Sequence, residues 1–245
     1  MGKRENIILG WHPLMEAIEA GTEIEKVWFL KDGDAKRAQT LKGLLQEKNI
    51  PLQFVPPIQL DKYGKTHQGV VARISQFEYT DENDFLESLE EGKEYAVVLA
   101  DKITDVRNLG AICRSIECFG AHALLIPDKE VASLNEFAVK SSAGALLKIP
   151  IIRSNNIKVT FQNFIANDFT SVACTEKGND IDKDTFKYDR NLIILGAEDK
   201  GISPYFLQMS GALARIPLVG TTQSLNVSVA AGIILHEWRK SVSEK

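Results

Sequence analysis

The stretch YAVVLADKITDVRNLGAICRSIECFG, residues 95–120, decides the fold class of this 245-residue chain. It opens with an apolar run that is typical of a strand buried on both faces of a parallel sheet. A polar turn follows, and apolar residues then recur at helical spacing from about Leu109 to Phe119, with Asn108 as a good helix cap. Because a strand, a turn and a helix follow directly on one another, the stretch predicts one unit of an α/β fold.

The same alternation continues toward the C-terminus. Further strands are expected near residues 123–126, 149–152, 170–174, 191–195 and 212–216, and helices near residues 136–142, 157–167 and 226–240. Strands that alternate with helices predict a parallel sheet covered on both faces. Ligands of such sheets bind at the carboxyl ends of the strands, so the loops that follow the strands are the candidate site.

The N-terminal part predicts a second, smaller α/β domain. Pro13 suits the first turn of one helix, and Asp34 suits the cap of another that runs to Lys48. Strands are expected at residues 26–30, 52–55 and 69–74. At about 100–200 residues per domain, the chain length allows two domains.

Charge is distributed unevenly along the chain, whose net charge is −4. Residues 76–95 carry eight acidic residues and one lysine, whereas the blocks on either side are neutral to mildly basic. The acidic stretch is expected to be a solvated linker or helix face. We therefore expect a domain at residues 1–75, a linker at 76–94 and a second domain at 95–245. The flanking blocks permit a polyanionic partner without requiring one.

Composition excludes several classes of protein. With 44% hydrophobic and 25% charged residues, the chain is too apolar for a disordered protein. The longest uncharged run, residues 216–235, contains Pro, Gly, Thr, Gln, Ser and Asn and does not suit a membrane span. The apolar run at residues 7–9 is too short for a signal peptide, so a cytoplasmic protein is expected. Three cysteines and four scattered histidines predict neither a disulfide framework nor a metal site.

Two of the candidate loops carry charged or amide side chains. In the first, residues 101–114, Arg114 lies about 200° around the helix from Ile112 and so points away from the core. In the second, residues 195–202, two glycines bracket Glu198, which permits close approach of the backbone to a ligand. This spacing is neither a dinucleotide fingerprint nor a phosphate loop. Taken singly, these features also fit a helix cap, a solvated arginine and a tight turn.

The third loop, residues 216–228, is uncharged and rich in Gly and Thr. It leads into a helix that is apolar on nearly every side, which predicts burial, in part by a second subunit. Asn226 at the start of this helix also fits an ordinary cap.

Together and in this order, the three loops resemble the three motifs of the SpoU (TrmH-type) RNA 2′-O-ribose methyltransferases. The matching segments are Asn-Leu-Gly-Ala-x-x-Arg at 108–114, Gly-x-Glu-x-x-Gly at 196–201 and Ser-Leu-Asn-Val-Ser at 224–228. The resemblance covers residues from about 96 to 240. Residues 9–17 and 67–70 resemble the ribosomal-protein-like substrate-binding domain of RlmB-type members, which modify a guanosine ribose in 23S-type ribosomal RNA.

The resemblance implies a SPOUT fold with a C-terminal trefoil knot, a homodimer, and S-adenosyl-L-methionine as the methyl donor. It implies cofactor contacts at Gly196, Gly201, Ile216, Gly220 and Leu225. It implies catalytic or orienting roles for Asn108, Arg114, Glu198, Ser224 and Asn226.

Two roles for Arg114 remain open. The family proposal makes it a general base, but the pKa of free arginine is above ~12, so a neutral guanidine at pH 7 is costly. Clamping a phosphate and stabilising the developing alkoxide is the other role. One departure concerns the same loop: the family usually has Asp-Pro-x-Asn-x-Gly where this chain has Asp105-Val106-Arg107-Asn108-Leu109-Gly110. The lost proline removes a fixed φ, so a less rigid loop is expected.

RNA would be held by basic side chains of both domains, with candidates at Lys3, Arg4, Lys36, Arg37, Lys62, Lys65, Arg73, Arg107 and Arg114. Three rival functions are a transfer RNA methyltransferase of the same family, a non-catalytic RNA-binding protein, and a nucleotide-binding enzyme of another class. The last predicts a glycine fingerprint after the first strand, and the sequence has none there.

Overall fold

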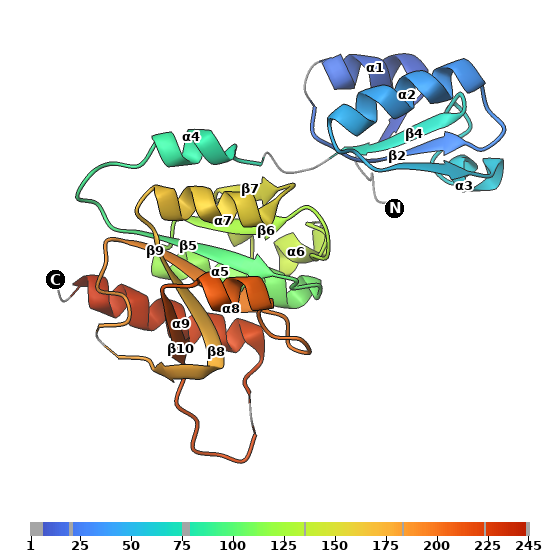
Figure 1. The fold of residues 1–245 in the computed structure, drawn as a ribbon. Coiled ribbons are helices and arrows are strands. Elements are labelled where there is room, and N and C mark those ends of the chain that lie inside the picture. The colour runs from blue at the N-terminus through green and yellow to red at the C-terminus, as the bar shows by residue number, and fades with distance from the viewer. Residues whose placement is uncertain are drawn as a thin grey trace. The chain divides into compact units, whose positions relative to one another are not determined.

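The computed structural model divides the chain into two units, Met1–Glu78 and Tyr79–Lys245 (Figure 1). It describes residues 7–19, 22–74, 79–134, 136–182, 184–222 and 224–243. Within these residues, no helix combines the length and the apolar character needed to cross a bilayer.

Unit 1 is built on a four-stranded sheet in the order β1-β4-β2-β3. Strand β4 runs antiparallel to β1 and β2, and β2 runs parallel to β3. The elements are β1 (Ile7–Leu9), α1 (Trp11–Glu19), β2 (Ile24–Leu30), α2 (Ala35–Glu47), β3 (Leu52–Val55), α3 (Pro57–Asp61) and β4 (Val70–Ile74). The predicted strands and the two longer helices are present, whereas β1 and the short α3 were not predicted.

The two faces of the unit 1 sheet are covered differently. Helices α1 and α2 lie on one face, where Leu14 and Leu41 pack against Phe29 (Figure 1). The predicted cap Asp34 accepts hydrogen bonds from the backbone N–H groups at the start of α2, at 2.9 and 3.0 Å. The short α3 lies on the opposite face, where its Leu60 packs with a small cluster that includes Trp28.

Unit 2 is built on a six-stranded, fully parallel sheet in the order β10-β8-β9-β5-β6-β7. Its strands are β5 (Tyr95–Asp101), β6 (Ala123–Pro127), β7 (Ile151–Ser154), β8 (Thr170–Asp180), β9 (Arg190–Gly196) and β10 (Ala212–Arg215). Its helices are α4 (Glu82–Glu87), α5 (Val106–Phe119), α6 (Glu136–Ser141), the 3-10 turn η1 (Ala145–Leu147), α7 (Ile157–Ala166), α8 (Pro204–Met209) and α9 (Val227–Ser243). The predicted α/β class with a parallel sheet is confirmed.

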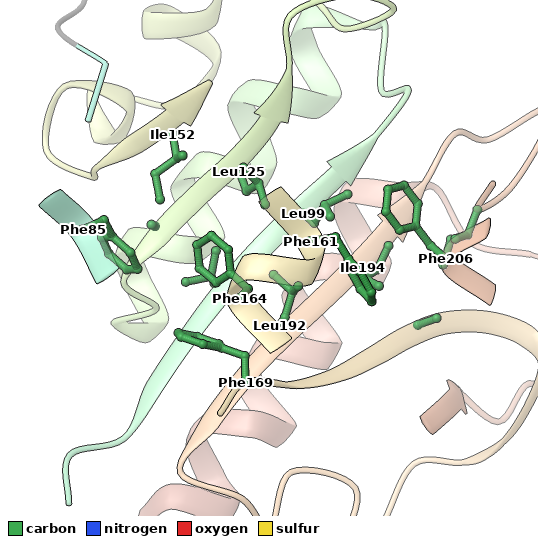
Figure 2. Packing of buried hydrophobic residues seen from close by; sticks show 14 residues of the cluster. Phe85, Leu99, Leu125, Ile152, Phe161, Phe164, Phe169, Leu192, Ile194 and Phe206 are labelled. Carbon is green, nitrogen blue, oxygen red and sulfur yellow. The ribbon is translucent and has the colours of Figure 1, made fainter. Parts of the chain in front are cut away.

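Aromatic side chains form much of the core on one face of this sheet (Figure 2). The ring of Phe164 on α7 lies 4.9 Å from Phe169 and 6.0 Å from Phe85. Phe161, one turn earlier, contacts Phe206 of α8 at 5.4 Å. Because burial of one such side chain contributes about 1.5–3 kcal/mol, this cluster holds α7 and α8 firmly on the sheet.

Part of the acidic segment is folded onto unit 2. Asp81 caps α4, the Phe85 side chain is 7% exposed, and Glu82 accepts hydrogen bonds from Thr160 and from the Asn163 side-chain amide at 2.7 Å. This differs from a solvated linker. A buried aromatic ring and a paired carboxylate together offset the entropy lost when this short helix is ordered.

Helix α5 begins three residues earlier than predicted. Its N-cap is Asp105, whose carboxylate accepts from the backbone N–H of Arg107 at 2.7 Å, and Asn108 lies inside the first turn. The prediction that Asn108 caps this helix is therefore wrong, and its side chain is available for other contacts. At Gly110 a Cβ atom would meet the Ser141 hydroxyl and would lie 2.9 Å from the Ala138 carbonyl, so glycine is needed for α5 and α6 to pack closely.

Helix α9 packs along α5 and buries one side. Its buried side chains are Val227, Ala231, Ile234, Leu235 and Trp238. Val229 is 51% exposed, and Ala230 and Ile233 are only partly buried. Helix α9 is apolar on nearly every side, but within a single chain it is buried on one side.

Candidate active site

The three predicted loops meet at one carboxylate. Oε1 of Glu198, in the loop after β9, accepts a hydrogen bond from the side-chain amide of Asn108 at 3.2 Å. The same oxygen accepts from the side-chain amide of Asn226 and from the backbone N–H of Val227 at 3.4 Å. The donors come from α5 and from the start of α9, so one oxygen ties three loops that are distant in sequence.

Asn226 is a helix cap and a bridge at the same time. Its Oδ1 accepts from the backbone N–H of Ser228 at 2.9 Å and from the Ser228 hydroxyl at 2.6 Å, which satisfies the start of α9. Its Nδ2 donates to Oδ1 of Asn108 at 3.0 Å and to Glu198. The helix cap expected from the sequence therefore accounts for the contacts of Oδ1 and not for those of Nδ2.

Two glycines shape the loop after β9. The backbone N–H of Gly201 donates to the carbonyl of Ala197 at 2.8 Å, and Gly201 has a left-handed φ of +64°. A Cβ atom on Gly196 would collide with the backbone of Gly201 and Ile202. The turn can therefore close only with glycine at its first position. Asp101, buried at the end of β5, accepts from the backbone N–H of Ser203 at 2.6 Å and secures the far side of the turn.

A cavity of about 800 Å³ lies beside this turn and under the loop that follows β10. Its lining includes all of the positions that the resemblance gives to the cofactor, and two of those that it gives to catalysis. These residues are Gly196, Gly201, Ile216, Gly220 and Leu225, together with Glu198 and Ser224. Apolar side chains such as Leu218, Val227 and Ile234 line it as well. The cavity thus combines glycine-rich turns with apolar side chains.

Arg114 lies apart from this cavity. It is exposed on α5, six residues and therefore about 9 Å along the helix axis beyond Asn108. The predicted direction of its side chain, away from the core, agrees with this exposure. Neither Arg114 nor the two asparagines are among the residues that line the cavity. A single chain therefore brings Asn108, Glu198 and Asn226 together and leaves Arg114 outside the group.

An ion pair joins the two neighbours of Val106, the position at which the family usually has proline. The guanidinium of Arg107 donates to the Asp105 carboxylate at 2.8 and 3.3 Å, and its side chain is 83% exposed. These hydrogen bonds, with that of the Arg107 backbone N–H, lower the pKa of Asp105 to about 2. The ion pair with Asp105 and the nearby charge of Glu198 raise the pKa of Arg107. Both groups are therefore ionised near neutral pH, and the ion pair carries no net charge.

The sequence did not point to the part of β8 that lines the cavity. The strand was expected to end at Cys174, but it continues to Asp180, and residues 174–176 face the cavity. Burial raises the pKa of the Cys174 thiol. The polar end of this strand is set by its pairing with β10, where Asn179 and Asp180 lie opposite Ala214 and Arg215.

The basic candidates of unit 1 differ in their surroundings. Lys36, Lys62 and Lys65 are exposed, whereas Arg37 lies 5.1 Å from the Trp11 ring and Arg73 lies 5.2 Å from the Trp28 ring. Lys3 and Arg4 lie outside the described residues.

Two family models match the chain. Residues 94–236 match the SpoU rRNA Methylase family, and residues 7–80 match the family described as RNA 2′-O ribose methyltransferase substrate binding. The first match covers more than half of the chain and includes all three joined loops.

Relatives and solved structures agree with these matches. A Staphylococcus epidermidis protein assigned to the TrmH family of tRNA/rRNA methyltransferases is 34% identical over 94% of each chain. The SpoU methyltransferase AviRb of Streptomyces viridochromogenes, in complex with AdoMet, is 24% identical with a TM-score of 0.59, over 97% of this chain and 90% of that one. A TrmH/SpoU tRNA-modifying enzyme of A. aeolicus is 26% identical with a TM-score of 0.56, over 66% of this chain and 83% of the other. The chain therefore belongs to the SpoU/TrmH family of RNA methyltransferases.

Proposed function

We propose that this protein transfers a methyl group from S-adenosyl-L-methionine to a ribose 2′-hydroxyl, that of a guanosine in large-subunit ribosomal RNA. The observation that carries the proposal is the convergence of Asn108, Glu198 and Asn226 beside an 800 Å³ cavity. The matched substrate-binding family of 2′-O ribose methyltransferases supports the ribose as the acceptor.

The cavity suits the proposed methyl donor. Backbone groups near Gly196, Ile216 and Leu225 can pair with the polar edges of an adenosine and an amino acid, and Leu218 and Val227 can cover its apolar parts. The absence of a Cβ at Gly196 keeps the turn narrow enough to border the cavity. When bound, this cofactor supplies a methyl group on a sulfonium, which is already a good leaving group. AviRb, which shares the fold, holds AdoMet.

The chain's own task is then to prepare the acceptor hydroxyl. A ribose hydroxyl is a weak acid and needs a base or a field that stabilises the developing alkoxide. In this proposal Arg114 supplies that stabilisation, or accepts the proton, and it also clamps an adjoining phosphate. Asn108 and Asn226, both fixed by Glu198, orient the ribose and Arg114, and Ser224 adds a hydrogen bond beside the cofactor.

A second copy of the chain completes the site in this proposal. Arg114 lies outside the cavity of its own chain, and α9 leaves Val229 half exposed beside the loops. A cytoplasmic homodimer that buries this side of α9 would bring Arg114 of one subunit toward the cavity of the other. The loop after β10 would be threaded as a trefoil knot, as the family resemblance implies.

Transfer RNA is the alternative substrate. The A. aeolicus tRNA-modifying enzyme matches 66% of this chain, so its likeness leaves about a third of the chain uncovered. A separate substrate-binding region in this chain favours ribosomal RNA. A non-catalytic RNA-binding role would not require the three loops to stay joined at Glu198.

The test is a transfer assay with labelled S-adenosyl-L-methionine. The acceptors are ribosomal RNA that lacks native modifications and, in parallel, unmodified transfer RNA, and the product is mapped by mass spectrometry. Label on one guanosine of large-subunit RNA supports the full proposal. Label on transfer RNA alone would show that transfer RNA is the substrate and would leave the proposed reaction unchanged. No label on either RNA, together with no binding of the cofactor, would favour the non-catalytic role.

A further inference from the structure

We propose that Glu176 makes the cavity selective for the charge of its ligand. The cationic S-adenosyl-L-methionine then binds more tightly than the product, S-adenosyl-L-homocysteine, which has no net charge. The inference rests on the proposed function for the identity of the cofactor. Glu176 lines the cavity from β8, a strand to which the family resemblance assigns no role.

Glu176 lies in a bulge of β8. Leu213 of β10 pairs with Ala173, but the next residue of β10, Ala214, pairs with Asn179, so the ladder skips residues 174–178. The first three residues of this bulge line the cavity. Bulges redirect side chains and are frequent beside active sites. The bulge therefore places Glu176 at the cavity wall instead of opposite a residue of β10.

The far end of the bulge is held firmly against β10. A Cβ atom on Gly178 would lie 2.5 Å from the backbone nitrogen of Ala214, so glycine is needed for this close approach. Asp180 pairs with Arg215 in the ladder and also through a side-chain ion pair. The backbone N–H of Ile181 donates to the Arg215 carbonyl at 2.9 Å. The bulge is therefore a fixed part of the cavity wall.

The charged residues of the cavity lining are mostly acidic. They are Glu176, Asp180, Glu198, Asp199, Lys200 and Arg215. Because Asp180 and Arg215 form an ion pair with each other, three carboxylates and one lysine remain, a net charge of −2. A lining of this sign attracts a ligand with one net positive charge more strongly than a ligand with none.

Glu176 can be changed without disturbing the joined loops. Glu198 already accepts hydrogen bonds from two asparagines, whereas Glu176 accepts one from the neighbouring Thr175 hydroxyl, at 3.2 Å. Among the described residues, no cation lies within ion-pair distance of Glu176. Lys177, the next residue of the bulge, is not part of the cavity lining. The charge of Glu176 is therefore available to a ligand in the cavity.

The two ligands differ by one charge. S-adenosyl-L-methionine carries an ammonium, a carboxylate and a sulfonium. When the methyl group leaves, the electron pair of the broken carbon–sulfur bond stays on sulfur, which becomes a neutral thioether, and the ammonium and carboxylate are unchanged. The attraction between Glu176 and the sulfonium charge is therefore lost with the methyl group, which favours release of the product.

Calorimetric titration of the full chain with each of the two ligands tests the inference. We expect Glu176→Gln to weaken binding of S-adenosyl-L-methionine about threefold or more, as removal of one charge several ångströms away does between the dielectric of water and that of a protein surface. Binding of S-adenosyl-L-homocysteine should stay close to that of wild type, which also shows that the variant is folded. Glu176→Asp keeps the charge and should keep the preference.

Salt gives a second measurement, on the wild-type protein. The preference for S-adenosyl-L-methionine should decrease as the salt concentration rises, because screening weakens the attraction between exposed charges. Glu87→Gln is the matched control, since Glu87 on α4 is exposed and lies outside the cavity lining.

Equal loss of affinity for both ligands in Glu176→Gln would overturn the inference, as would an unchanged preference in that variant or equal affinities in wild type. Wild-type protein that prefers S-adenosyl-L-methionine through Glu176 but transfers no methyl group to RNA would overturn the proposed function alone. Wild-type protein that binds neither ligand would overturn both.

Discussion

The side-chain amide of Asn226 donates a hydrogen bond to Oδ1 of Asn108 at 3.0 Å, across 118 residues of sequence. Both amides also donate to Glu198, so each of the three side chains contacts the other two. The triad fixes the start of α9 against the first turn of α5 and holds the loop after β9 between them.

Asn226→Ser should distinguish the two roles of Asn226, which caps α9 and bridges Asn108 and Glu198. Serine is a good N-cap, so the unfolding free energy should change little, whereas Asn226→Ala should cost about 1 kcal/mol more through loss of the cap. Both variants lose the amide that reaches Asn108 and Glu198, and both should lower the rate of methyl transfer by about a hundredfold. Thermal unfolding and single-turnover transfer give the two readouts. Full activity of Asn226→Ser would show that the hydrogen bonds from Asn226 to Asn108 and Glu198 are not needed for methyl transfer.

Gly196→Ala should distort the turn beside the cavity. The added methyl group collides with the backbone of Gly201 and Ile202, and such overpacking costs about 1–3 kcal/mol. We expect a lower melting temperature and at least tenfold weaker binding of S-adenosyl-L-methionine by calorimetry. Gly43→Ala on α2 is the control, because its Cβ would also meet open space and Gly43 lies outside the cavity lining. Equal affinity in both variants would show that the narrow turn does not shape the cofactor site.

Arg114→Ala should abolish transfer while the cofactor still binds, because Arg114 lies outside the cavity. Arg114→Lys distinguishes the two proposed roles. If a positive charge stabilises the alkoxide, lysine should retain a measurable part of the rate with an unchanged pH profile. If Arg114 is a base, lysine should shift the pH profile of the rate, since its ordinary pKa is lower. Wild-type activity of Arg114→Ala would exclude either role.

Val229→Glu should break the proposed dimer. Val229 is 51% exposed on α9 within one chain, and a carboxylate there would be buried without a partner in an apolar interface. We expect sedimentation as a monomer and loss of transfer. Val159→Glu on α7 is the control, since Val159 is equally exposed, at 53%, on another helix. A fully active monomeric Val229→Glu protein would contradict the assignment of Arg114 to a partner subunit.

His122 should make the unfolding free energy depend on pH. Burial lowers its pKa below the ordinary 6.5, with a smaller contribution from the charge of Arg239. The folded state therefore resists protonation more than the unfolded state does. Its contribution to stability is fully present above pH 6.5 and is lost as the pH falls through the folded-state pKa.

Urea unfolding at several pH values between 7.5 and 5 measures this dependence. We expect His122→Gln to flatten the curve in that range. His236→Gln serves as the control, because His236 is exposed on α9. Equal slopes for wild type and His122→Gln would show that another group sets the pH dependence.

The sequence predicted most elements of both units because their apolar residues recur at clear strand or helix spacing. It failed where tertiary pairing decides the structure. β8 extends to Asp180 because β10 supplies hydrogen-bonding partners for its polar end. α4 forms within an acidic segment because Phe85 and Glu82 find partners on α7 and its neighbours. Neither partner can be recognised from local sequence.

By itself, the sequence determined the α/β class, the order of the elements and the identity of the three loops, because these depend on local periodicity and on residue types at fixed spacing. Only the tertiary structure decided that Asp105 caps α5, which frees Asn108 to reach Glu198 and Asn226. It also placed Arg114 outside the cavity that the loops surround. The physical reason is that a side chain's partners are set by how helices and strands pack in space, which local sequence spacing does not specify.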